Sequence, residues 1–159
     1  MTINLKLINV EQYQDERDTI FALLEQIWTR QESLDNVKHS VDRWGTSQTE
    51  SGTYFYIMRG NEPIGITGYF IPSLETGDFG LRHHGTTVRG TGRAALDSLC
   101  GYLQESYGSS FQRMIELIPQ GREELIDRFA KWGFELSSDP VPAWESKKDY
   151  YKYVMVREH

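Results

Sequence analysis

The sequence predicts a mixed α/β fold in which a mostly antiparallel sheet of six to seven strands is flanked by about four helices. Three observations predict it. Segments 3–10 and 64–71 alternate apolar and polar residues, which is typical of half-buried strands. Apolar residues at helical spacing lie between such segments, and the nearly apolar run 114–119 is typical of a buried parallel strand. Strand and helix patterns therefore share one chain.

The residue pattern in the first third of the chain predicts one strand and two helices. After the strand over 3–10, Asp15 is a candidate N-cap. A helical stripe follows it at Ile20, Leu23, Leu24, Ile27 and Trp28. Segment 34–44 is a shorter and more polar helical candidate, and 45–52 is rich in Ser, Thr and Gly, which indicates a loop.

The middle of the chain predicts three sequential antiparallel strands. The aromatic and β-branched segment 53–59 is separated from 64–71 by the turn 60–63, which indicates a hairpin. A polar turn over 73–77 then leads to a third strand over 78–85.

A strand, helix, strand unit opens the second half. The helix after residue 92 has one apolar stripe: Leu96, Leu99, Cys100, Leu103 and Tyr107. It connects the strands 78–85 and 114–119 as a right-handed crossover. Segment 122–132 predicts the last helix, ending at Gly133, and 134–137 and 149–157 predict strands on either side of a loop over 138–148.

Composition predicts an ordinary single domain. The chain has 159 residues, of which 38% are hydrophobic and 25% charged, and its formal net charge is −6. No apolar run reaches the roughly 18–20 residues of a membrane span, and the first ten residues lack a signal-peptide pattern, so we expect a cytoplasmic protein without membrane partners.

Cys100, the one cysteine, is expected to be a buried and inert thiol. The acidic balance disfavours nucleic acid and favours amine-bearing partners.

The corner between the strand 78–85 and the following helix has the features of an anion site. A helix start offers backbone N–H groups without intrahelical partners, together with partial positive charge. Gly90 and Gly92 allow a ligand to approach the backbone closely, and Arg89 and Arg93 can meet phosphate. The corner therefore predicts a phosphorylated ligand.

Two known phosphate motifs fit this corner poorly. A P-loop needs a Gly-Lys-Ser/Thr ending, and no lysine lies near it. The dinucleotide fingerprint is matched literally by Gly90-Thr91-Gly92-Arg93-Ala94-Ala95, with Glu116 roughly 20 residues on. That match comes past mid-chain, where too few strand and helix units remain for a doubly wound sheet.

A third interpretation is a resemblance. The stretch Arg89-Gly90-Thr91-Gly92-Arg93-Ala94 resembles the Arg/Gln-x-x-Gly-x-Gly/Ala pyrophosphate loop of the GNAT family of N-acetyltransferases. Phe129-Ala130-Lys131-Trp132-Gly133-Phe134 is similar to that family's Tyr-x-x-x-Gly-Phe segment. The predicted order of strands and helices over 1–159 is also that of the family, so the resemblance covers nearly the whole chain.

The resemblance implies a single GNAT-like domain over 1–159 that transfers an acetyl group from acetyl-CoA (coenzyme A as carrier) to a primary amine of a small molecule or protein. It implies a splayed sheet with the cofactor between the fourth and fifth strands. The cofactor-binding residues that it implies are Thr86, Thr87, Val88, Arg89, Gly90, Thr91, Gly92, Arg93, Ala94 and Phe129.

Catalysis of amine acetylation needs a group that accepts a proton from the attacking amine. The candidates are His83 and His84, directly before the corner, with Asp78 on the same strand and Glu116 on the next. Because adjacent strand residues face opposite sides, at most one histidine should reach a shared cleft unless a bulge intervenes. The histidine spacing does not predict a metal site.

Phe129 stands where the family often has a proton-donating tyrosine. Either another donor such as Tyr102 or Tyr151 serves, or the thiolate leaves with the help of water, or the protein is a degenerate acyl-CoA-binding sensor or interaction module. A weaker alternative function is a transferase acting on charged tRNA. The sequence leaves the acceptor open and allows a homodimer through the loop 140–148.

Overall fold

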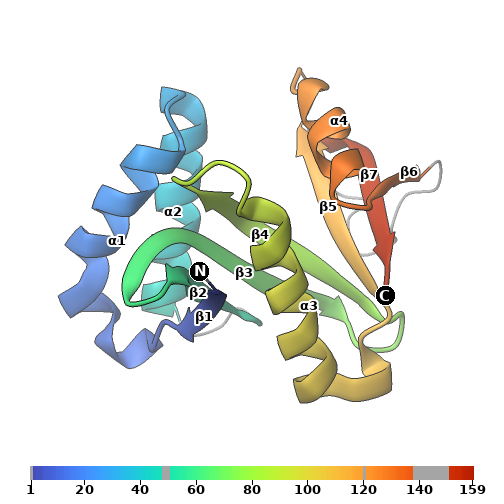
Figure 1. Cartoon of the computed structure of the whole chain (residues 1–159), viewed down its shortest axis with the longest axis horizontal. Helices are drawn as coiled ribbons and strands as arrows, with labels where there is room; N and C mark the ends of the chain where they lie inside the picture. Colours follow the sequence, from blue (N-terminus) through green and yellow to red (C-terminus); the bar gives the residue numbers. More distant parts are fainter. Residues whose placement is uncertain (1, 48–50, 120, 138–150) are drawn as a thin grey trace. The chain divides into compact units, whose positions relative to one another are not determined.

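The computed structural model describes residues 2–47, 51–119, 121–137 and 151–159 (Figure 1). In chain order its strands and α-helices are β1 (Ile3–Leu7), α1 (Tyr13–Ile27), α2 (Gln31–Ser47), β2 (Thr53–Arg59), β3 (Glu62–Ser73), β4 (Asp78–Thr86), α3 (Gly92–Tyr107), β5 (Arg113–Pro119), α4 (Glu124–Lys131), β6 (Glu135–Ser137) and β7 (Tyr151–Glu158). Short 3-10 turns follow β1 at Val10–Gln12 and α3 at Gly108–Ser110.

The strands form a seven-stranded sheet in the order β1-β2-β3-β4-β5-β7-β6. β1 pairs with β2 and β2 with β3 in antiparallel registers, whereas β4 residues Asp78–Gly80 pair in parallel with Arg113–Ile115 of β5. β7 pairs antiparallel with both β5 and β6. This mixed, mostly antiparallel sheet with helices confirms the predicted fold class and the predicted order of elements.

Two predicted boundaries at the start of the chain are wrong for local reasons. The first strand ends at Leu7 rather than Val10, because the side chain of Asn9 accepts the N–H of Glu11 and starts a 3-10 turn. Helix α1 begins at Tyr13 with Gln12 at its N-cap, so Asp15 lies in its first turn and does not cap it.

The predicted loop over 45–52 is wrong in its first part. Helix α2 continues to Ser47, and Trp44 and Gly45 are buried on its inner face. Packing thus overrides the low helix propensity of this segment. The predicted loop over 138–148 lies outside the described residues.

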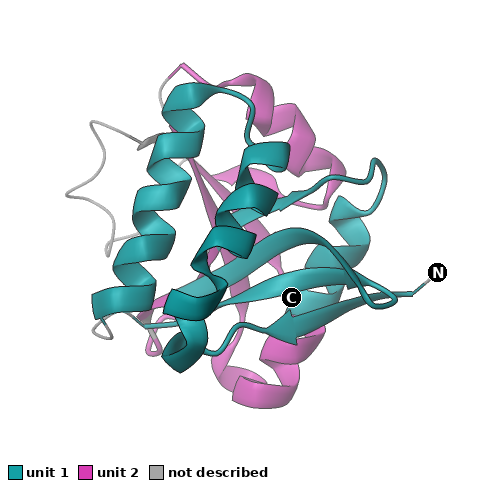
Figure 2. Cartoon of the chain, turned by 90° about the vertical axis from the view of Figure 1, so that its left-hand side faces the viewer, with its two compact units in different colours: residues 1–70, 82–99 teal, residues 71–81, 100–159 magenta. Residues whose placement is uncertain are grey.

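The chain is divided into two compact units, which Figure 2 shows in different colours. Unit 1 comprises residues 1–70 and 82–99, and unit 2 comprises residues 71–81 and 100–159. β3, β4 and α3 each contribute residues to both units. The expectation of one domain over 1–159 stays a prediction.

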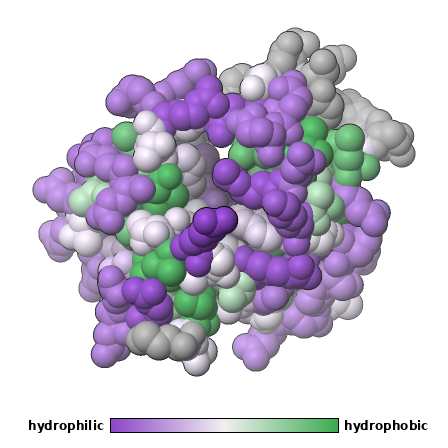
Figure 3. All heavy atoms as spheres, turned by 45° about the horizontal axis from the view of Figure 1, so that its top comes forward, coloured by the Kyte–Doolittle hydropathy of each residue, from purple (hydrophilic) through white to green (hydrophobic). Residues whose placement is uncertain are grey.

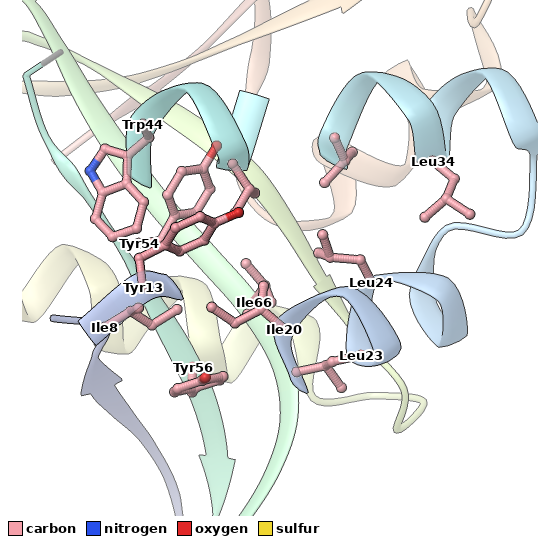
Figure 4. Packing of buried hydrophobic residues seen from close by; sticks show 12 residues of the cluster. Ile8, Tyr13, Ile20, Leu23, Leu24, Leu34, Trp44, Tyr54, Tyr56 and Ile66 are labelled. Atoms are coloured by element: carbon pink, nitrogen blue, oxygen red, sulfur yellow. The ribbon is translucent and has the colours of Figure 1, made fainter. Parts of the chain in front are cut away.

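The core of unit 1 lies between α1, α2 and the strands β2 and β3 (Figure 4). Its aromatic centre is Trp44, whose ring meets Tyr13 and Tyr54 edge-on at centroid distances of 6.1 and 5.1 Å. A second buried cluster joins Ala95 of α3 to Ile57 and Ile64, with Val88 packed against it. This cluster fixes the first turns of α3 on the sheet of unit 1.

Unit 2 has its own aromatic core. Phe79 meets the rings of Tyr107 and Phe111 at centroid distances of 4.9 and 5.2 Å. Phe111 in turn contacts the ring of His159 at 4.7 Å. The start of β4, the end of α3 and the end of the described chain are thereby held together within this unit.

Hydrophilic side chains cover much of the face in Figure 3, and hydrophobic ones form separate small areas on it. The large hydrophobic side chains that are exposed among the described residues are Leu7, Leu74 and Leu136. Within the described residues, every helix is too short or too polar to cross a membrane.

Tyr13 links α1 to α2 through both its hydroxyl and its ring. The hydroxyl donates a short hydrogen bond to Asp42, whose carboxylate also accepts two bonds of 2.8 Å from Arg17. The bonds from Arg17 hold the pKa of Asp42 below its usual range, and burial raises that of Tyr13. The ring lies against Gly45, where a Cβ would be 2.3 Å from Tyr13 Cδ2.

Substituting Gly45→Ala should lower the free energy of unfolding by about 2 kcal/mol, because the new methyl group would overlap the Tyr13 ring. The matched control is Gly101→Ala in α3, where a Cβ has no neighbour within 4 Å, and which should stabilise the protein by about 0.5–1 kcal/mol. Urea denaturation measures both. Equal stability of Gly45→Ala and the parent protein would contradict the packing of Tyr13.

Candidate functional site

Hydroxyl groups shape the corner between β4 and α3. The hydroxyls of Thr86 and Thr91 lie 2.8 Å apart, and both reach the carbonyl of Val88, at 2.9 and 2.6 Å. Thr87 donates its N–H and its hydroxyl to the carbonyl of Ile64 in β3, at 2.7 and 3.1 Å. The loop is thus held by hydrogen bonds from its threonines to a carbonyl of the loop itself and to a carbonyl of β3.

Other backbone N–H groups of the same loop have no acceptor among the described residues. In the part of the chain that the structure describes, the N–H groups of Arg89, Gly90, Gly92 and Ala94 donate no hydrogen bond. Gly90 has a φ of +87°, and a Cβ there would have no neighbour within 4 Å. Several donors at the positive end of α3, beside an exposed Arg89, are an arrangement that can accommodate an anion.

His84 lies beneath this corner, between β3 and the first residue of α3. Its Nδ1 is 2.7 Å from Thr67 Oγ1, and its Nε2 is 2.7 Å from the carbonyl oxygen of Gly92. A carbonyl oxygen can only accept, so the contacts assign the proton to Nε2, and Nδ1 accepts the hydroxyl proton of Thr67. Burial lowers the pKa of His84 to about 4, which keeps the ring neutral at pH 7.

His83 has different surroundings. Its ring stacks on Tyr54 with centroids 6.2 Å apart, and Trp28 meets it edge-on at 6.4 Å. Burial, and secondarily the charge of Arg82, lower its pKa to about 4. Neither ring nitrogen of His83 has a hydrogen-bond partner among the described residues. The two histidines therefore contact different elements, as the alternation of strand residues predicts, and only His83 keeps a nitrogen able to accept a proton.

The backbone at His83 is unusual. Its φ of +37° is in the left-handed region, the one such value for a residue other than glycine in the described chain. This conformation costs of order 1 kcal/mol for a residue with a Cβ, so the surrounding contacts must hold it. It turns the strand locally, directly before the glycine corner.

Close packing of glycines brings α1 and β3 onto this part of β4. A Cβ on Gly85 would lie 2.5 Å from Ile27 and 3.2 Å from the Trp28 ring. A Cβ on Gly65 would lie 2.3 Å from the carbonyl oxygen of Gly85. Glycine at both positions is therefore required for the contacts that place Trp28 beside His83.

Asp78 and Glu116 belong to unit 2 and have contrasting surroundings there. Asp78 accepts a bond of 2.6 Å from Arg113 Nε, an ion pair that joins the starts of β4 and β5. Glu116 has no ion pair with any residue that the structure describes, and burial raises its pKa well above the usual range, partly offset by a bond from the Leu117 backbone. Asp78 thus has an ion-pair partner, whereas Glu116 has none within the described part of the chain.

Phe129 is buried in unit 2, where its ring meets Trp132 and Phe134 edge-on at 5.4 and 5.5 Å. Its backbone carbonyl accepts the N–H of Phe134 at the end of α4. These contacts make Phe129 a core residue of its unit. Its implied place at the cofactor stays a prediction.

Thr67 and Tyr54 are neighbours of the histidines that sequence reasoning did not assign to the site. Thr67 had a detectable signal, because it is a polar residue at a position flanked by apolar and glycine residues in a predicted strand. Tyr54 resembles an ordinary core aromatic residue in the sequence. Among the described residues, no group of three or more His, Cys, Asp or Glu side chains is placed to hold a metal ion.

This arrangement of sheet and helices is the GNAT acetyltransferase fold. No family model and no curated protein sequence matches the chain. Solved structures do match, at low identity and over nearly all of both chains.

An acetyltransferase from Thermus thermophilus superposes with a TM-score of 0.62 at 18% identity, covering 100% of this chain and 98% of the other. The PaiA N-acetyltransferase from Thermoplasma acidophilum, in complex with coenzyme A, gives 0.64 at 10% identity and covers 100% of both. The aminoglycoside acetyltransferase AAC(6')-Ib, in complex with coenzyme A and kanamycin, gives 0.67 at 16% identity, covering 99% and 95%. These similarities establish the fold.

The two partly buried histidines make stability depend on pH. Their folded pKa values of about 4 lie below the unfolded value of about 6.5, so between these values the unfolded chain binds more protons. Stability should therefore fall from pH 7 to pH 5, by on the order of 1–2 kcal/mol per histidine. His84→Gln should be less stable at pH 7 but lose less on acidification, as measured by urea denaturation at both pH values.

Because the pKa of Glu116 is raised, this residue makes stability rise on acidification, and it does so in both the parent protein and His84→Gln. The informative quantity is therefore the difference between the parent protein and His84→Gln in how steeply stability changes with pH. Identical slopes for His84→Gln and the parent protein would show that His84 is not held neutral.

Proposed function

We propose that this chain is an acetyl-CoA-dependent N-acetyltransferase that acts on a primary amine of a small molecule or protein. The observation that carries the proposal is the row of backbone N–H groups at Arg89, Gly90, Gly92 and Ala94 that have no acceptor among the residues that the structure describes. It coincides with the stretch that resembles the pyrophosphate loop of the GNAT family. The fold of solved acetyltransferases supports it further.

The residues of the corner fit a pyrophosphate group. Its oxygens would accept from the backbone N–H groups of the loop, and Arg89 and Arg93 would supply positive charge from exposed positions. The threonines fit a shaping role, because Thr86, Thr87 and Thr91 direct their hydroxyls at backbone carbonyls of the protein. Val88 packs inward and anchors the loop.

We infer from the length of the cofactor's arm that its reacting end would lie near His83. The arm between the pyrophosphate and the sulfur of coenzyme A has about twelve bonds, roughly the length of four residues of extended chain at ~3.5 Å each. If the arm follows β4 back from Val88, its end falls beside His83 and His84. The left-handed turn at His83 lies at this place.

When bound, acetyl-CoA would supply an acetyl group activated as a thioester. In the overall reaction the amine nitrogen forms a bond to the acetyl carbon, the carbon–sulfur bond breaks, and the proton lost by the amine balances the thiol of coenzyme A. Within unit 1, the ring nitrogens of His83 have no described partner, and we therefore propose that His83 accepts that proton. His84 is unsuited, because both of its nitrogens are engaged.

The acceptor is proposed as an amine on chemical grounds. The net charge of −6 favours cationic partners. A structural neighbour binds the aminoglycoside kanamycin, which carries amines. Trp28, half-buried against His83, would contribute an aromatic surface on the acceptor side, and we propose the cytoplasm as the place of action.

A second candidate is an acyl-CoA-binding module without efficient transfer. The observation that favours it is Phe129, which stands at the position of the family's proton-donating tyrosine and is packed in the core of unit 2. The two candidates share the cofactor and differ in turnover.

The first experiment compares thermal stabilisation by acetyl-CoA, coenzyme A and NAD, since a ligand that binds the folded state raises Tm. We expect both CoA species, and not NAD, to raise it. Gly92→Glu should abolish the effect by placing a negative charge at the anion site. Gly101→Glu introduces the same charge on the same helix, at a position with open space, and should preserve it.

Stabilisation by NAD alone, or by none of the three, would contradict the proposal. Equal affinities of Gly92→Glu and Gly101→Glu for coenzyme A would show that the cofactor does not bind at this corner. If CoA binds but releases no thiol with any amine tested, the binding-module candidate replaces the enzyme.

For catalysis, His83→Asn is the informative variant, because asparagine tolerates the left-handed backbone but cannot accept a proton. It should lower kcat/KM about 100-fold and leave the Kd of coenzyme A within about twofold. The ratio of parent to variant activity should stay constant from pH 6 to 9 and shrink only below about pH 5, as His83 becomes charged. An unchanged kcat/KM in His83→Asn would assign proton transfer to another group.

A further inference from the structure

We propose that His84 is a positioning residue that orients the anion-binding end of α3 through a relay of hydrogen bonds starting at Thr67. The inference rests on the proposed function, because the anion in question is the pyrophosphate of coenzyme A. It gives His84 a role distinct from the proton transfer assigned to His83.

The relay has a fixed direction. Thr67 is a fully buried polar residue in the middle of β3, and its hydroxyl donates to His84 Nδ1 at 2.7 Å. His84 Nε2–H then donates to the carbonyl of Gly92, also at 2.7 Å. Both bonds are short for nitrogen and oxygen partners, and both need the neutral ring.

The last bond acts on the peptide unit that opens α3. The Gly92 carbonyl belongs to the same planar peptide as the Arg93 N–H, and in a trans peptide these two groups point in opposite directions. A carbonyl held from below by His84 therefore directs the N–H toward the N-terminal side of the helix. That is the side on which the N–H groups of Gly90 and Gly92 have no acceptor within the described chain.

Hydrogen bonds in series also polarise one another. A carbonyl that accepts a bond makes the N–H of its own peptide a better donor, and the effect is larger where the surroundings exclude water. His84 thus strengthens as well as orients the donor at the start of α3. A rigid ring with an acceptor on one side and a donor on the other is needed to span from β3 to α3.

This arrangement predicts that removing His84 changes the affinity for the cofactor but not the rate of the chemical step. Loss of His84 should weaken ligands that carry pyrophosphate, while the chemical step at saturating acetyl-CoA, with its pH profile, should be preserved. A catalytic base would show the reverse behaviour.

The experiment is a calorimetric titration of the full-length protein with coenzyme A and with inorganic pyrophosphate. We expect His84→Ala to raise the Kd of coenzyme A about tenfold and Thr67→Val to raise it by a smaller factor. Thr67→Ser, which keeps the hydroxyl, is the matched control and should match the parent protein. The kcat at saturating acetyl-CoA should stay within about twofold in all three variants.

A second measurement does not depend on any ligand. The ¹⁵N chemical shifts of His84 at pH 7 should report a neutral ring protonated at Nε2, and Thr67→Val should alter the Nδ1 shift. A proton on Nδ1 instead would overturn the relay. This readout also serves if His84→Ala fails to fold.

Three outcomes of the titration and the turnover assay would overturn the inference: an unchanged Kd in His84→Ala, an equal effect of Thr67→Ser and Thr67→Val, or a large loss of kcat with an unchanged Kd. If the parent protein binds neither coenzyme A nor pyrophosphate, the proposed function fails and the inference falls with it. Normal binding by the parent protein together with any of the three outcomes refutes the relay alone.

Discussion

The close approach of β3, β4 and the end of α1 is the constraint on which the corner of unit 1 depends. Glycine at positions 65 and 85 removes the side chains that would hold these backbones apart. With them removed, Thr87 reaches the Ile64 carbonyl with both of its donors, and Trp28 lies beside β4. A loop anchored on this side can leave its other N–H groups for a ligand, because its shape no longer depends on them.

The histidine pair shows how one strand can supply two different functions. Alternation along β4 sends His83 toward Trp28 and Tyr54, and His84 toward Thr67 and Gly92. Both rings are neutral because burial disfavours their charged forms. Their chemistry differs through their hydrogen bonds: a ring with both nitrogens bonded holds structure, and a ring with none of them bonded to described residues can take part in proton transfer.

The order of the elements and the glycine corner could be predicted from the sequence, because periodicity and turn residues are local signals. The bond between Thr67 and His84 could not be, since it joins residues on different strands. The left-handed conformation of His83 also lacked a local signal, because histidine does not require it. The continuation of α2 through Gly45 was missed for a related reason: glycine there is selected by contact with Tyr13, a residue far away in the sequence.

The backbone conformation at His83 also restricts how this position can diverge. Left-handed φ values are tolerated by glycine and asparagine, and to a lesser extent by aspartate and histidine, whereas β-branched residues are strongly disfavoured. Related chains that retain the turn should therefore draw on a short set of residues at this position, and only some of that set can exchange protons. If His83 is the proton acceptor that we propose, a change to glycine or asparagine would preserve the architecture and remove the proton transfer in a single step, so active enzymes and inactive binders could arise within one lineage without any change of fold.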